Sequence, residues 1–147
     1  MSPAELWQGV DQFNRGDYYA CHDTLEAIWM DAIAQQKPFY QGILQIAVGF
    51  YHLRNHNWRG AAILLGEGSH RLGPFEPAHS GIDVVDLVDQ AQAWLMALQT
   101  AGPEGVQAVA AQLSSATEAT TDVTAEPVNL PPPQIRASQP RPNQSTN

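Results

Sequence analysis

The strongest constraint on the fold is the segment of residues 38–54, PFYQGILQIAVGFYHLR, which is apolar on nearly every side when it is drawn as a helix. Pro38 is well placed to open that helix, because the first helical turn needs no intrahelical N–H donor. A helix that is apolar all round is buried in the centre of a protein, so other helices must surround it. No stretch of the sequence alternates with period two for long enough to form a sheet. The sequence therefore predicts an all-α fold.

Five further helices are predicted around the central one from apolar periodicity and from helix start and stop signals. They cover about residues 3–13, 17–36, 58–72, 84–99 and 103–113. Asp17, Asn57 and Asp83 precede three of these segments and are residue types that cap helix N-termini. The predicted architecture is a compact bundle of five to six helices arranged as stacked antiparallel hairpins.

A change of composition predicts where the helical domain ends. Residues 1–117 are expected to form a single helical domain. From about residue 118 the sequence is rich in Pro, Ser and Thr and has no aromatic residue. Such a segment buries too little apolar surface to offset the entropy lost on ordering. Residues 118–147 are therefore predicted to be a disordered tail.

Charge and cysteine content exclude several classes of function. The formal net charge is −8, and the seven Lys and Arg residues are spread along the chain, so we expect no nucleic-acid binding and no binding to an anionic membrane. Cys21 is the one cysteine, which excludes an intrachain disulfide. The apolar stretch at residues 42–53 is too short to span a bilayer, and residues 1–13 do not resemble a signal peptide. We therefore expect a cytoplasmic protein.

Polar residues interrupt the apolar faces of two neighbouring predicted helices. His22 and Glu26 share a helical face with Leu25 and Trp29, at the spacing i, i+3, i+4 and i+7. Asp23 is turned about 100° away by the helical period, so we expect it to point elsewhere.

The next helix carries a second polar stripe, formed by Gln41, Gln45 and His52. If the two helices pack antiparallel, the two stripes face each other. The expected result is a polar seam between the helices, walled by the aromatic residues Tyr19, Trp29 and Tyr40.

Two interpretations of this seam stay open. As a site, His22 and Glu26 would act as acid and base, or would hold a divalent metal ion with His52 as a third ligand. Gln41, Gln45 and Tyr19 would then orient a small-molecule substrate. As structure, the same groups would form a satisfied, buried hydrogen-bond network that fixes the packing of the two helices.

Three sequence blocks resemble one family. In order within residues 5–98, they are FNRGDYYACHDTLEAIW, FYQGILQIAVGFYHL and NWRGAAILLGEGSHRL. In these blocks the chain resembles the helical bacterial and archaeal family called domain of unknown function 309. The resemblance implies a compact helical fold and the label of a predicted metal-dependent hydrolase, with no substrate attached. The family usually has Glu where this chain has Asp23, and an acidic residue near Ala20 or Cys21.

Two functions follow as hypotheses. The first is a metal-dependent hydrolase that uses the polar seam. The alternative is a non-catalytic interaction or scaffold module of stacked helical hairpins, binding a protein partner or a second copy of itself. It is suggested by the segment GDYYACHDTLE, which resembles the first helix of a tetratricopeptide repeat, and by similar helix starts 40 residues apart, at Asp17-Tyr18 and Asn57-Trp58.

Overall fold

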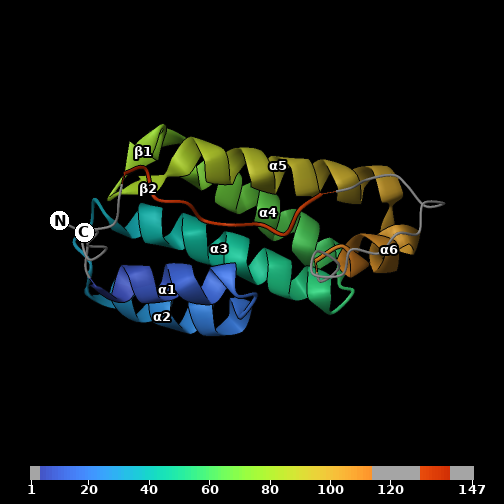
Figure 1. The fold of residues 1–147 in the computed structure, drawn as a ribbon, viewed down its shortest axis with the longest axis horizontal. Coiled ribbons are helices and arrows are strands. Elements are labelled where there is room, and N and C mark those ends of the chain that lie inside the picture. The colour runs from blue at the N-terminus through green and yellow to red at the C-terminus, as the bar shows by residue number, and fades with distance from the viewer. Residues whose placement is uncertain (1–3, 114–129, 140–147) are drawn as a thin grey trace, which may run out of the picture.

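The structure is a computed structural model that describes residues 4–113 and 130–139, and within them it confirms the all-α prediction (Figure 1). The described residues contain the helices α1 (Ala4–Asn14), α2 (Tyr18–Asp31), α3 (Lys37–Arg54), α4 (Trp58–Leu72), α5 (Val84–Ala101) and α6 (Val106–Ala111). Short 3-10 turns η1 (Gly73–Phe75) and η2 (Pro103–Gly105) follow α4 and α5. The two-residue strands β1 (Ala78–His79) and β2 (Ile82–Asp83) pair antiparallel just before α5.

Two of the three predicted capping residues cap their helices. The side chain of Asn57 accepts a hydrogen bond from the backbone N–H of Gly60, and that of Asp83 accepts one from Asp86. Asp17 precedes α2 without capping it, because its carboxylate pairs with the Arg15 guanidinium at 3.3 Å instead. The two helix starts 40 residues apart are thus confirmed.

Helix α2 is shorter than predicted. Periodicity placed its end near Gln36, whereas it ends at Asp31, and the Ala32 backbone is extended. A turn follows, in which Gln36 N–H donates to the Ile33 carbonyl. Lys37 then places its ammonium group 4.2 Å from the centre of the Trp29 ring. The chain needs this turn because α3 must run back against α2, and a helix continued to residue 36 would carry it away.

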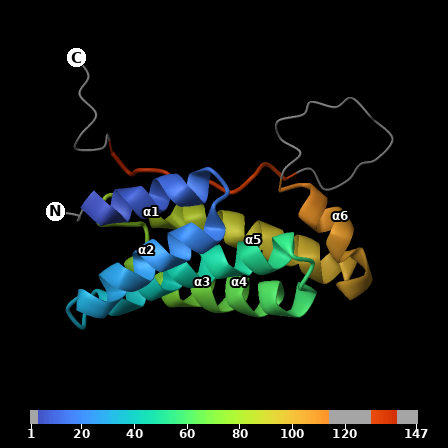
Figure 2. The same ribbon diagram turned by 90° about the horizontal axis from the view of Figure 1, so that it is seen from below.

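Helix α3 is central, as its apolar character predicts. It packs most extensively against α4, then against α2, and α4 packs in turn against α5 (Figure 2). Phe50 lies fully buried at the middle of the core, edge-on to the rings of Phe13 and Trp94.

Among the described residues, no helix combines the length and the apolar character that crossing a membrane would require.

Residues 130–139 differ from the expectation for the tail, and we call this segment the strap. It runs in extended conformation between α1 and α5 toward β2 (Figure 1). Ile135 is only 2% exposed and belongs to the hydrophobic core, with Leu130 and Ala137 packed against it. The prediction of disorder is therefore corrected for these residues, because one buried isoleucine and a row of backbone hydrogen bonds hold them in place. The predicted boundary at residue 117, and residues 118–129 and 140–147 of the predicted tail, lie outside the described residues.

Candidate functional site

Helix α2 has a narrow buried face and a broad face that is accessible to solvent. Tyr18, Cys21 and Leu25 are its buried residues. Burial raises the pKa of the Cys21 thiol to about 12, so this cysteine is a core residue and not a nucleophile. His22 and Glu26 lie one position further along from Cys21 and Leu25, on the side of the helix that reaches solvent. The outer face of α2 is thus where polar chemistry is accessible.

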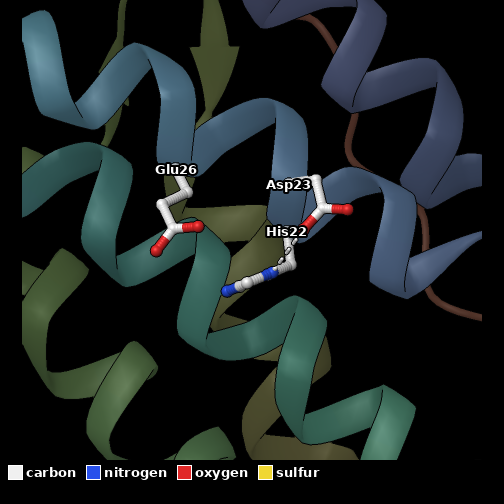
Figure 3. A group of neighbouring side chains, drawn as sticks. All are labelled: His22, Asp23 and Glu26. Carbon is white, nitrogen blue, oxygen red and sulfur yellow. Dashed lines mark hydrogen bonds and ion pairs between the residues drawn. The ribbon is translucent and has the colours of Figure 1, made fainter.

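His22, Asp23 and Glu26 form a compact group on this face (Figure 3). One ligand atom from each of the three lies within 4.8 Å of the other two. The Nδ1 atom of His22 is 3.2 Å from an Asp23 carboxylate oxygen, and the two side chains are 22% and 62% exposed. The expectation that Asp23 points elsewhere was wrong. The side chain of a neighbouring residue on the helix is long enough to reach back to the imidazole, even though the two Cβ atoms point about 100° apart.

Tyr19 is the aromatic neighbour of this group. Its ring centre lies 5.5 Å from that of His22 and 5.2 Å from that of Tyr51 on α3. Tyr19 is 54% exposed, so it contacts these two rings and also reaches solvent. Tyr51 was not anticipated as a neighbour, although its position on α3, one residue before His52, could have indicated it.

The predicted polar seam between α2 and α3 does not form with the predicted residues. Gln45 turns toward α4, where its amide donates to a Glu67 carboxylate oxygen at 3.1 Å and accepts from the Arg71 guanidinium at 3.0 Å. His52 accepts a hydrogen bond from the Asn57 amide at 3.2 Å, beside the start of α4.

Gln41 lies one turn before Gln45 on the same stripe and is half-buried. The structure therefore groups His22 with Glu26, as predicted, but the third member is Asp23 and not His52.

The two other predicted walls also face other partners. Trp29 lies beneath the Lys37 ammonium group. Tyr40 is 5% exposed and lines a separate groove between α1 and α2, together with Ile28. Burial raises the pKa of the Tyr40 hydroxyl above its usual value, so it stays protonated. Tyr19 is the predicted wall residue that contacts His22.

The donor set suits a divalent metal ion. One imidazole nitrogen and two carboxylate oxygens are the kinds of ligand that borderline ions such as Mn²⁺, Fe²⁺ and Zn²⁺ accept. All three side chains come from α2, and Figure 3 shows the imidazole of His22 close to the carboxylates of Asp23 and Glu26. Because the group is open to solvent, water or a substrate could complete the coordination. The fold thus defines a compact helical protein with a candidate metal centre on an outer helix.

Comparison with known proteins gives a family match over part of the chain. Residues 6–64 match the family described as "Domain of unknown function (DUF309)", which confirms the resemblance seen in the sequence blocks and includes His22, Asp23 and Glu26. The "Uncharacterized protein YpuF" of Bacillus subtilis (strain 168) is 40% identical over 50 residues, which are 33% of this chain and 29% of the relative. The match thus covers less than a third of that relative's length. No solved structure matches the chain.

Proposed function

We propose that this protein binds a divalent metal ion through His22, Asp23 and Glu26 and uses it to hydrolyse a small substrate. The observation that supports the proposal is the spacing of the three ligand atoms, which all lie within 4.8 Å of one another on a solvent-accessible face. When bound, such an ion would polarise an oxygen of the scissile group as a Lewis acid.

The side chains of this protein would hold the metal ion and orient the substrate. His22 would offer one ring nitrogen to the ion, and Asp23 and Glu26 would each offer a carboxylate oxygen. Tyr19, half-exposed beside His22, would stack on or donate a hydrogen bond to a substrate. Gln45 has no part in this proposal, since both ends of its amide are already hydrogen-bonded.

Metal binding is tested by titrating the purified protein with Mn²⁺ and Zn²⁺ in a calorimeter. We expect His22→Ala to weaken binding by about 10-fold or more, as losing one of three protein ligands should. His52→Ala is the matched control, because His52 sits on the neighbouring helix and faces Asn57. Equal loss in both variants, or no binding by the unmodified protein, would refute the proposal.

The hydrolytic step is tested separately with chromogenic ester and phosphoester probes. Activity that needs added metal and is lost in Asp23→Asn and Glu26→Gln would support it. In a different outcome, the protein binds metal at this group but hydrolyses neither class of probe faster than the His22→Ala variant does. That result would refute the hydrolase activity and keep the metal site.

We propose as a second candidate a non-catalytic interaction module, favoured by the groove between α1 and α2. Its volume is about 610 Å³, and Ile28 and Tyr40 line it. Ile33 also lines it and is 64% exposed. Glu5 and Asp31 are its charged lining residues, and both are acidic. A partner with an apolar face and positive charge, such as a basic amphipathic helix, complements this lining.

A synthetic amphipathic helix of leucine and lysine serves as the probe for this second candidate. We expect Ile33→Asp to weaken its binding, and Met96→Asp to leave binding unchanged. Met96 is a suitable control because it is equally exposed, at 66%, but lies on α5. Equal binding by both variants would count against the groove.

A further inference from the structure

The strap is held mainly through its backbone, in the manner of a bound peptide. The side-chain amide of Asn14, at the end of α1, makes two hydrogen bonds to Ile135. Its oxygen accepts from the Ile135 N–H at 2.7 Å, and its nitrogen donates to the Ile135 carbonyl at 3.0 Å. One side chain therefore satisfies both backbone groups of one strap residue.

A second amide repeats this arrangement on the preceding strap residue. The Gln90 oxygen, on α5, accepts from the Gln134 N–H at 2.9 Å, and the Gln90 nitrogen donates to the Gln134 carbonyl at 2.8 Å. Asn14 on α1 and Gln90 on α5 thus hold consecutive strap residues. Figure 2 shows the strap running along these two helices. Because these bonds reach only backbone atoms, they fix an extended conformation and do not depend on the peptide's side chains.

The edge of β2 also binds the backbone of the strap. The N–H of Asp83 donates to the Arg136 carbonyl at 2.9 Å, and the N–H of Ser138 donates to the Gly81 carbonyl at 2.8 Å. Ile82 and Ala137 form an antiparallel bridge between these bonds. The strap therefore pairs with the β2 edge through one bridge, and pairing along a strand edge is a common way for proteins to bind extended peptides.

Two strap side chains supply selectivity. Ile135 is 2% exposed and is inserted into the core. Arg136, the next residue, places its guanidinium 3.0 Å from a carboxylate oxygen of Asp86 on α5. The surface therefore favours an apolar residue followed directly by a basic one.

We propose that this surface, made by Asn14, Asp86, Gln90 and the β2 edge, is a docking site for an extended peptide with an apolar–basic pair, and that the strap occupies it in cis. Sixteen residues, 114–129, lie in sequence between Leu113 and the strap. A tethered occupant of this kind has an effective concentration in the millimolar range, so it blocks the site against weaker partners. The partner is a peptide segment of matching pattern, which gains access when the strap is released.

The test uses the full chain and a labelled peptide with the sequence of residues 130–139, LPPPQIRASQ. The variant Ile135→Asp removes the buried anchor of the strap and should open the site. We expect the peptide to bind this variant at least about 10-fold more tightly than it binds the unmodified protein, as followed by fluorescence anisotropy. Equal binding to both proteins would overturn the proposal.

Two controls address specificity. A peptide with Asp in place of the isoleucine should not bind the opened variant. Adding Asn14→Ala to Ile135→Asp should weaken binding by the labelled peptide, because both hydrogen bonds to the isoleucine backbone are lost. If the doubly substituted protein binds as well as Ile135→Asp alone, the peptide is bound elsewhere and the assignment fails.

The Ile135→Asp variant could also lose its fold, and circular dichroism detects this. In that case millimolar peptide should restore the helical signal, because a ligand that binds only the folded state stabilises it. Failure to restore the signal would make the strap an integral part of the core and would contradict the proposal. A concentration-dependent dimer of the unmodified protein that Ile135→Asp dissociates would instead identify a second copy as the occupant, against the proposed partner peptide.

Discussion

Helices α2 and α3 are neighbours and both carry polar residues, yet they use them differently. The polar side chains of the core helix α3 form hydrogen bonds with neighbouring helices, as Gln45 does with Glu67 and Arg71 on α4. The outer helix α2 buries three residues and leaves His22 and Glu26 accessible. The difference shows that a polar residue on a surrounded helix is used for packing, whereas one on an outer helix is available for chemistry.

The largest expected effect tests the close packing of α3 on α4. A Cβ atom at Gly68 would lie 2.7 Å from Ile46 Cγ1 and 2.8 Å from the Gly42 carbonyl oxygen. Since backbone atoms cannot give way cheaply, we expect Gly68→Ala to lower the free energy of unfolding by about 2–3 kcal/mol, measured by urea denaturation.

Gly66→Ala is the matched control on the same helix. Its Cβ atom would meet only Leu95 Cδ2, at an ordinary distance of 3.7 Å. Because alanine is the better helix former, this variant should be as stable as the unmodified protein or more stable by up to about 1 kcal/mol. Similar losses in the two variants would show that α3 and α4 are not packed as closely as described.

The next largest effect comes from substituting one polar residue on α3 and one on α2 and comparing the losses in unfolding free energy. Gln45→Ala removes the common partner of Glu67 and Arg71 from a position only 9% exposed, so we expect a loss of about 1–2 kcal/mol in unfolding free energy. Glu26→Gln changes an exposed group on α2, so its effect should stay within about 0.5 kcal/mol. A Glu26→Gln loss as large as that of Gln45→Ala would restore the buried-network interpretation of His22 and Glu26.

The smallest expected effect concerns a histidine packed against α3. The His79 ring lies 4.5 Å from that of Phe39, and burial lowers the His79 pKa below its ordinary value of 6.5. The unfolded state therefore binds a proton more readily than the folded state, and this stabilising contribution is present above pH 6.5 and is lost on acidification below it.

We accordingly expect the stability advantage of the unmodified protein over His79→Gln to shrink between about pH 7.5 and pH 5. Thermal melting at several pH values measures it. An advantage that grows on acidification would mean that His79 is better solvated in the folded state than its contacts indicate.

The sequence predicted the helices better than their relative rotation. The bounds of α4 coincide with the prediction, because Asn57 marks its start and the Gly-Pro pair at residues 73–74 its end. The end of α2 was misplaced because residues 32–36 continue the composition of a helix, and only the return of α3 requires a turn there.

The polar stripe of α3 was assigned to the wrong neighbour. Periodicity shows that Gln45 and His52 share a face, but it does not show which helix that face meets. Gly42 and Gly49 lie on the same face, and a Cβ atom at either would meet leucine side chains of α4. Glycines beside a polar stripe were thus the available signal that a close helix contact, and not an open site, lies there.

The strap could not be predicted from its own composition. Its prolines and polar residues match those of disordered segments, and its two buried residues are Pro133 and Ile135. The groups that hold it, Asn14 and Gln90, are 121 and 44 residues away along the chain from their strap partners. Only the assembled helices bring these two amides to the strap.

That separation has a consequence for how the chain acquires its structure. The hairpins form from residues close in sequence, whereas the hydrogen bond between Asn14 and Ile135 joins residues 121 positions apart in the chain. Contacts at such separation carry a high entropic cost until the intervening helices are already in place. We therefore expect the strap to dock last, so that during refolding the Ile135 amide gains protection from hydrogen exchange after the amides of α3 and α4. Every newly made molecule would then pass through a stage in which its helices are formed and the docking surface around Asn14 is still uncovered.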